Sequence, residues 1–300
     1  MKDSGGTSVV DANALHLGKL LHLSCSILWT YRVDLFCGAV RRVCDTRRMQ
    51  LQDILYSQGF GTRRVCAGLV QQNLVEVYTQ NTDLAPVLCA ESAMDFDPEG
   101  LRFRVQGVDW PYHRQAYVLL NKPAGTECSQ KPSTYPSIYT LLPSPLRLRP
   151  QKGALQGVQA VGRLDQDTTG LLLLSDDGQF IHRMTSPKKH VPKVYEVTTK
   201  HPLDDEQVAK LLAGVVLDDD PKPVRAAGCE AIGSHHLRLT LTEGKYHQVK
   251  RMLAAVSNRV EGLHRSQMGS FALPADLLPG QWRWLSAQDL AQLTAAQTGS

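Results

Sequence analysis

The sequence predicts an α+β protein built on a mixed, largely antiparallel sheet with flanking helices. Four consecutive leucines at residues 171–174, followed by an Asp-Asp-Gly turn, are typical of a strand buried on both faces. From residue 117 onward, strand-like stretches are interrupted by helical ones without regular alternation, which favours α+β over parallel α/β. Residues 49–110 instead predict two short helices and a hairpin, and therefore a separate small domain.

Composition limits the class of protein. The 300 residues are 42% apolar, which is enough for a sizeable core and about two domains. No apolar run is long enough to cross a membrane, so we expect a soluble, cytoplasmic protein. The seven cysteines form no CxxC pair and no even disulfide framework, which favours a reducing compartment and speaks against a zinc site. The sequence also lacks a P-loop and a Rossmann glycine motif, so it predicts neither a cofactor nor a metal.

Residues 1–48 differ from the rest of the chain. They hold three of the seven cysteines and end in a cluster of arginines. Acidic residues interrupt the segment, and no clean apolar core precedes a cleavage site, so it makes a poor signal peptide. We predict that it is an extension and that the native product begins at Met49.

Residues 49–110 are expected to form the small domain. A first short helix has apolar residues on one face and is ended by a glycine, and a second has a threonine cap and apolar residues one turn apart. Residues 74–77 then alternate as a strand, and turn-rich stretches at 97–100 and 110–111 separate this domain from residues 111–300. The two helical patterns consist of Leu51, Ile54, Leu55 and Gly59 in the first helix and Thr62, Val65 and Leu69 in the second.

Charge is distributed unevenly between the two expected domains. Residues 49–110 carry four basic and eight acidic residues, whereas residues 111–300 carry 22 and 17. Phosphate binding needs clustered basic residues, and in the small domain only Arg63 and Arg64 are clear candidates. We therefore expect this domain either to orient a nucleic acid with weak affinity of its own or to be purely structural.

The larger domain is expected to end in a helix capped by Ser286, with Asp289 three residues on. Before it, residues 130–157 are rich in proline and basic residues and predict a surface loop that either contacts a nucleic acid or is simply solvated. The basic residues of that loop are Arg147, Arg149 and Lys152. The expected strands are 117–120, 193–199, 226–232 and 237–242, with two more near 260 and 282, and the expected helices are 180–185, 204–213 and 246–257.

The run VGRLDQDTTG at residues 161–170 leads directly into the four leucines, so its polar side chains should be held rigidly against the core. Such rigidity suits a catalytic carboxylate at Asp165. Two other interpretations stay open. Asp165 and Asp167, with Asp176 at the twelfth position, imitate an EF-hand calcium loop, although a strand rather than a helix follows. Alternatively, Asp165 only caps a turn or pairs with Arg163, which looks buried.

Four motifs, in order, resemble those of the pseudouridine synthases. They are NKPAG at 121–125, GRLD with DTTGLLLL at 162–174, KVYEV at 193–197 and EGKYHQVKRM at 243–252. The resemblance extends from about residue 49 to residue 293. It implies the mixed sheet of that family, preceded by a small RNA-binding domain of the alpha-L type first described in a ribosomal protein.

The resemblance also implies site residues. Asp165 matches the family's nucleophile, Tyr195 its base-stacking tyrosine, and Lys250 a cation that keeps the carboxylate ionised. Val249 would pack beneath the base, and Arg163 would bind phosphate or brace the loop. The other residues expected to bind substrate are Lys122, His247, Arg251, Arg63 and Arg64.

The last motif, with lysine at 250 and Tyr-His at 246–247, most resembles the small-subunit branch of the family. The resemblance therefore implies isomerisation of one uridine in 16S rRNA by a monomer that acts on a partly assembled small ribosomal subunit, without cofactor, metal or membrane. Three alternatives remain: a synthase acting on 23S rRNA, a catalytically silent ribosome-assembly factor, and a glycosidase-like hydrolase that uses Asp167 as its second carboxylate.

Overall fold

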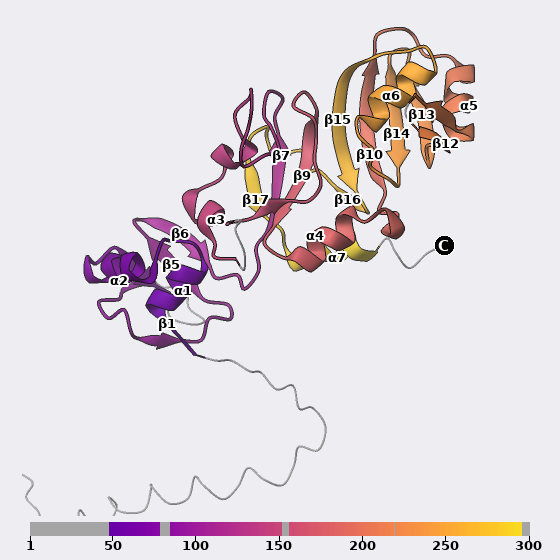
Figure 1. Ribbon diagram of the computed structural model, residues 1–300. Coiled ribbons are helices and arrows are strands. Elements are labelled where there is room, and N and C mark those ends of the chain that lie inside the picture. Colours follow the sequence, from indigo (N-terminus) through magenta and orange to yellow (C-terminus); the bar gives the residue numbers. More distant parts are fainter. Residues whose placement is uncertain (1–47, 79–84, 152–155, 219, 296–300) are drawn as a thin grey trace, which may run out of the picture. The chain divides into compact units, whose positions relative to one another are not determined.

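The computed structural model describes residues 48–78, 85–151, 156–218 and 220–295, and a ribbon view is given in Figure 1. The predicted extension at residues 1–48, apart from residue 48, and the predicted basic side chain of Lys152 lie outside these ranges. Among the described helices, none is long and apolar enough to cross a membrane.

One large sheet carries most of the strands after residue 116 (Figure 1). Its order is β13-β14-β10-β15-β9-β7-β17, with β16 paired to β15 and β8 paired to β9. Strands β15 and β9 run parallel, and the other pairs of named strands described in this sheet are antiparallel. The predicted mixed, largely antiparallel α+β sheet is confirmed. The strands are β7 (Tyr117–Lys122), β8 (Gln159–Ala160), β9 (Thr169–Ser175), β10 (Lys193–Thr199), β13 (Gly228–Gly233), β14 (His236–Leu241), β15 (Val260–Met268), β16 (Phe271–Ala272) and β17 (Trp282–Trp284).

Strand β9 is buried on both faces, as its leucines predict. Leu171 and Leu173 pack into the core formed with α4 and α7, whereas Leu172 and Leu174 pack into the core formed with α3. Removing one such side chain typically costs about 2–5 kcal/mol, so β9 is a rigid support for the loop that precedes it. The flanking helices are α3 (Ser144–Leu148), α4 (Gly178–Thr185), α5 (Asp205–Ala213), α6 (Gln248–Ala255) and α7 (Ala287–Ala295), with short 3-10 turns η1 (Ile138–Leu141) and η2 (Pro187–Lys189).

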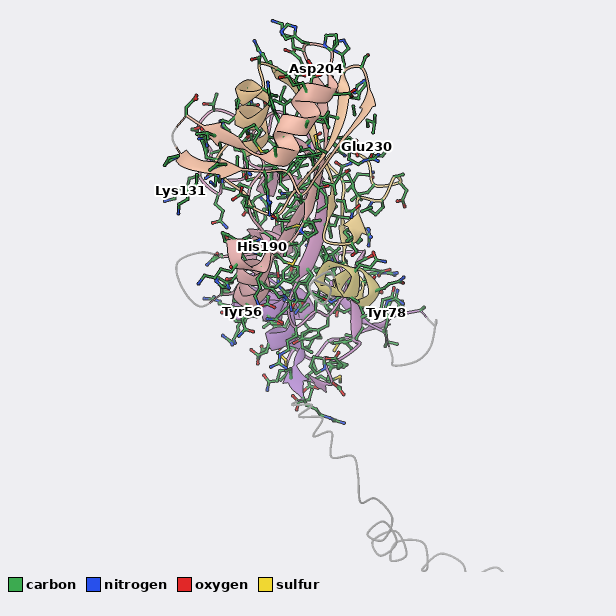
Figure 2. All side chains as sticks on the ribbon, turned by 90° about the vertical axis from the view of Figure 1, so that its right-hand side faces the viewer. Tyr56, Tyr78, Lys131, His190, Asp204 and Glu230 are labelled. Carbon is green, nitrogen blue, oxygen red and sulfur yellow. The ribbon has the colours of Figure 1, made fainter. Side chains whose placement is uncertain are left out.

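Helix ends follow the predicted capping residues. The Ser286 hydroxyl accepts the Asp289 N–H at 3.1 Å, and the Asp289 carboxylate accepts the Ser286 N–H at 2.9 Å, which confirms the capping box before α7. Asp204, labelled in Figure 2, caps α5 by accepting the N–H of Gln207 at 2.7 Å. A two-stranded ribbon follows α5, formed by β11 (Val215–Leu217) and β12 (Asp220–Val224).

The predicted helices and strands of the small domain are present, but the buried face of the second helix was predicted incorrectly. Thr62 caps α2 as expected, but the buried residues of α2 are Cys66 and Val70, while Val65 is exposed. Residues 110–111 complete β6 rather than form a linker. The alpha-L assignment and the domain boundaries stay predictions. The elements are β1 (Met49–Gln50), α1 (Leu51–Ser57), α2 (Arg63–Gln71), β2 (Val75–Val77), β3 (Val87–Leu88), β4 (Asp95–Phe96), β5 (Arg102–Val105) and β6 (Val108–Pro111).

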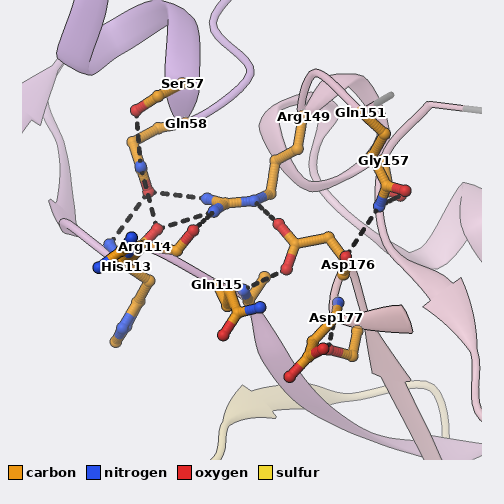
Figure 3. A network of polar contacts seen from close by, with 12 residues as sticks. Ser57, Gln58, His113, Arg114, Gln115, Arg149, Gln151, Gly157, Asp176 and Asp177 are labelled. Carbon is orange, nitrogen blue, oxygen red and sulfur yellow. Dashed lines mark hydrogen bonds and ion pairs between the residues drawn. The ribbon is translucent and has the colours of Figure 1, made fainter. Parts of the chain in front are cut away.

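A buried arginine connects the segment after α1 to the large sheet (Figure 3). Arg149 donates from Nε to Asp176 at 2.6 Å, from Nη1 to the side chain of Gln58 at 2.8 Å and from Nη2 to the carbonyl of His113 at 2.7 Å. Its side chain is only 3% exposed. The expectation that Arg149 belongs to a solvated, RNA-contacting loop is wrong, because its guanidinium group donates its hydrogen bonds to partners inside the protein.

Candidate active site

The loop at residues 161–168 connects β8 to β9 and is anchored on both faces of the sheet. Val161 packs into the core beside α4, and Leu164 packs into the core beside α3. Between these anchors Arg163 is exposed, not buried as the sequence suggested, while the side chain of Asp165 is 28% exposed. Asp165 is therefore held in place yet open to a ligand, and it makes no ion pair with Arg163 among the described contacts.

Lys122 lies beneath this loop and is fully buried. Its ammonium donates to three carbonyl oxygens, those of Pro123 at 3.0 Å, Gln166 at 3.3 Å and Thr168 at 2.9 Å. Burial lowers the pKa of Lys122. The prediction that Lys122 binds substrate is wrong, because the amine has no access to the surface; it positions the loop by holding its backbone.

Helix α6 brings Lys250 to the loop. Val249, Met252 and Leu253 bury one face of the helix in the core, which leaves Lys250 directed at the carboxylates. The Lys250 Nζ lies 3.4 Å from Asp165 Oδ2, so the predicted pair is present. It lies nearer to Asp167, at 2.7 and 2.9 Å from the two carboxylate oxygens.

Asp167 is a partner that the sequence reasoning missed. Desolvation works against its ionisation, but the hydrogen bond and charge of Lys250 outweigh it and lower the pKa of Asp167. Desolvation likewise works against the charge of Lys250, yet Asp167 and Asp165 together raise the pKa of Lys250. A glycosidase acid needs a raised pKa and a free oxygen, so Asp167 does not suit the hydrolase alternative. The only signal for this pairing in the sequence is the Asp-x-Asp spacing, which lets one cation reach both carboxylates.

His247 approaches the other oxygen of Asp165. Its Nε2 lies 3.4 Å from Asp165 Oδ1, and Lys250 Nζ lies 3.4 Å from the other oxygen, Oδ2. His247 has a left-handed backbone (φ 47°) and stacks on the ring of Tyr246 with centroids 3.8 Å apart. The predicted helix start at residue 246 is wrong: α6 begins at Gln248, whose side chain accepts the N–H of Lys245 at 2.9 Å and so holds a turn before the helix.

Two cavities meet at Asp165. The smaller, of about 100 Å³, has an apolar part lined by Tyr195, Val249, Leu241 and Leu263, and its other walls are polar and include Asp165, Glu243 and Lys250. Tyr195 is half-buried in β10, a central strand, which fixes its position. The larger cavity, of about 540 Å³, is lined by residues 127–129, 133–135, 163–167, 246, 247 and 250. A flat ring in the smaller cavity would have a tyrosine and a valine as apolar walls and a carboxylate at its mouth.

The remaining predicted binding residues fall into two groups. Arg163 lines both cavities, whereas Arg251 donates to the carbonyl of Tyr246 at 3.0 Å and supports the turn before α6. Arg63 and Arg64 begin α2 and line neither cavity. Arg63 pairs with Asp53 at 2.5 Å, so part of its charge is already compensated.

The calcium interpretation of the loop fails on Asp176. One oxygen of that carboxylate accepts from Arg149 at 2.6 Å and the other accepts the N–H of Ala116 at 2.7 Å. Asp176 directly follows β9, eight residues beyond the loop, and it cannot also be the twelfth ligand of an EF-hand. Within the described residues, no group of three or more His, Cys, Asp or Glu side chains is placed to hold a metal ion.

Comparisons with known proteins agree with this geometry. The pattern of the family described as RNA pseudouridylate synthase matches residues 116–255. The chain is 42% identical over 179 residues to the ribosomal small subunit pseudouridine synthase A of Yersinia pestis, covering 60% of this chain and 73% of that protein. It is 36% identical over 233 residues to the protein of the same name from Haemophilus influenzae, covering 77% of this chain and 94% of that protein.

The fold is also similar to a solved structure described as a pseudouridylate synthase. The two share 32% sequence identity and a TM-score of 0.55, over 82% of this chain and all of the other. Sequence and structure thus point to the same family, independently of any single motif. The chain belongs to the pseudouridine synthase family, in the branch of the ribosomal small subunit pseudouridine synthases A.

Proposed function

We propose that this enzyme isomerises one uridine of 16S rRNA to pseudouridine and that Asp165 is its essential carboxylate. One observation carries the assignment to Asp165: it stands where the two cavities meet, with His247 at one oxygen and Lys250 at the other. Both neighbours are fixed by the backbone, through α6 and the left-handed turn before it. A carboxylate so placed has a cation and an imidazole within 3.4 Å and faces any base in the smaller cavity.

The reaction breaks the N1–C1′ bond of uridine, turns the base and forms a C5–C1′ bond, after which C5 loses its proton and N1 takes one up. Asp165 either attacks C1′ or stabilises the positive charge that develops on the sugar. The target base leaves its stack and enters the smaller cavity, where Tyr195 lies against its face and Val249 beneath it. The isomerisation transfers neither electrons nor an external group, so these side chains suffice without a cofactor.

The choice of RNA follows from the relatives and from the turn before α6. The two curated relatives are named for the small ribosomal subunit. Tyr246 is 69% exposed and stacks on His247, which offers a flat surface and a ring nitrogen to unpaired bases near Asp165. We further propose a cytoplasmic monomer acting on partly assembled small subunits, with residues 49–110 as an orienting alpha-L domain and residues 111–300 as the catalytic domain.

The test is a mapping of pseudouridines in ribosomal RNA from cells that lack this enzyme. One pseudouridine should be missing from 16S rRNA and none from 23S rRNA. The parent protein should restore it, whereas Asp165→Asn, which removes the charge but little volume, should not. Asp205→Asn on the exposed face of α5 is the matched control and should restore it fully. A missing site in 23S rRNA would overturn the target, and restoration by Asp165→Asn at a tenth of the parent rate or more would overturn the role of Asp165.

A further inference from the structure

The proposed function assigns no part of the RNA to the cavity of about 540 Å³. Its volume is within the range of sites that bind small molecules, and it opens beside Asp165. The walls come from three segments that are distant in sequence, which contribute residues 127–129 and 133–135, residues 163–167, and residues 246, 247 and 250. Because the target base occupies the smaller cavity in the proposed function, this larger space is available to another part of the same RNA.

The wall at residues 127–135 is a preorganised loop centred on Glu127. One carboxylate oxygen of Glu127 accepts the N–H groups of Thr134 and Tyr135, each at 2.9 Å, and the other accepts the N–H of Ser133 at 3.0 Å. These backbone hydrogen bonds lower the pKa of Glu127 to about 2, and the one from Tyr135 contributes most. The main chain of Glu127 is bound as well, to Pro136 and Ile138. The loop therefore keeps its shape at any pH near neutrality.

This loop presents an aromatic ring to the cavity. Tyr135 is 40% exposed and lines the cavity, while Lys131 of the same loop is exposed and points away from the ribbon in Figure 2. A further wall carries the stacked rings of Tyr246 and His247. Rigidly held, exposed aromatic rings around a polar space are the arrangement on which unpaired bases stack in RNA-binding proteins.

The charges around the cavity also suit a nucleotide. The carboxylate of Glu127 is occupied by backbone N–H groups and that of Asp167 by Lys250, so neither is left to repel a phosphate at full strength. Arg163 is exposed at the edge of the cavity and forms no ion pair among the described contacts. A base between aromatic walls and a phosphate at Arg163 would both be accommodated.

We propose that this cavity binds the nucleotide adjacent to the target uridine, with its base stacked on Tyr135. The site rests on the proposed function, because it places the neighbouring nucleotide by reference to a uridine bound at Asp165. It makes Tyr135 a residue that contributes to the selection of single-stranded RNA context, whereas Asp165, Tyr195 and Lys250 act on the uridine itself.

The test is a cycle that combines Tyr135→Ala with removal of the neighbouring base. The substrates are a 16S rRNA fragment containing the target and two versions that are abasic on the 5′ or the 3′ side of it. On the intact fragment Tyr135→Ala should lower kcat/KM by roughly 5- to 150-fold, the range of one lost stacking contact. On one of the two abasic fragments the parent and Tyr135→Ala should be equal. Tyr135→Phe should keep the parent value, and Leu278→Ala, another exposed position, controls for surface truncation.

The dissociation constants of the same three fragments, measured by fluorescence anisotropy, give a second readout that does not depend on catalysis. They should show the same pattern. Equal kcat/KM and affinity for the parent and Tyr135→Ala on the intact fragment, or losses that multiply on both abasic fragments, would overturn the subsite. If the parent modifies no 16S uridine, the proposed function fails by itself, and the affinities still decide whether Tyr135 contacts a base.

Discussion

Replacing Lys250 by methionine tests whether this ammonium keeps Asp165 ionised. The Nζ lies 3.4 Å from Asp165 Oδ2. Two unit charges at that distance interact with about 1 kcal/mol in water and about 5 kcal/mol at an effective dielectric constant of 20. Both side chains are 28% exposed, so the interaction lies between these limits. Lys250→Met should therefore lose an attraction of between about 1 and 5 kcal/mol that acts on the ionised form of Asp165.

The assay is a single-turnover pH–rate profile on the 16S fragment. In Lys250→Met the acidic limb should move to higher pH, because the carboxylate has lost the cation that favours its charged form. In Asp167→Asn it should move to lower pH or stay in place, because Lys250 then has Asp165 as its remaining partner. Lys189→Met, an exposed lysine of η2, is the matched control. An acidic limb that stays in place in Lys250→Met, or moves upward in both variants, would refute the coupling.

Two further predictions concern the supports of the site. Arg149→Met should lower the free energy of unfolding in urea by about 3–5 kcal/mol, because the carboxylate of Asp176, which is 10% exposed, loses its cation. Arg149→Lys should recover only part of this loss. A loss below about 1 kcal/mol in Arg149→Met would contradict the reasoning. Burial lowers the pKa of Lys193 to about 8, so between about pH 8 and 10.5 the unfolded chain binds more protons and stability should rise with pH. In Lys193→Met that rise, up to about 3 kcal/mol, should be absent when the free energy of unfolding is measured against pH. An equal rise in the parent and in Lys193→Met would contradict the prediction.

The sequence predicted those features that depend on local periodicity. Strand β9 and the capping box of α7 were both predicted correctly, because each depends on residues within a few positions of one another. The face of α2 shows the limit of this reasoning. The pair Val65 and Leu69 and the pair Cys66 and Val70 have the same spacing, and tertiary packing buries the second pair.

The long-range contacts were beyond the reach of such patterns. Lys122 is 44 residues from the carbonyl of Gln166, and Arg149 is 91 residues from Gln58. A lysine or arginine in a polar motif is most often solvated, so nothing local indicates that its donors are satisfied by buried carbonyls. The resemblance to a family predicted that Asp165 and Lys250 would meet. It gave no sign that Asp167, from 83 residues away, would hold Lys250 more closely.

The sharing of Lys250 between two carboxylates has a consequence for the bound state. Asp167 is the more exposed partner, at 52% against 28% for Asp165, so water weakens the Lys250–Asp167 interaction more than the Lys250–Asp165 one. A base that fills the smaller cavity displaces water from the side of Asp165 and lowers the dielectric constant there. If the uridine binds as proposed, the interaction of Lys250 with Asp165 then gains strength relative to its interaction with Asp167. In that scheme Asp167 holds the ammonium within reach while the site is open, and entry of the uridine strengthens the Lys250–Asp165 pair.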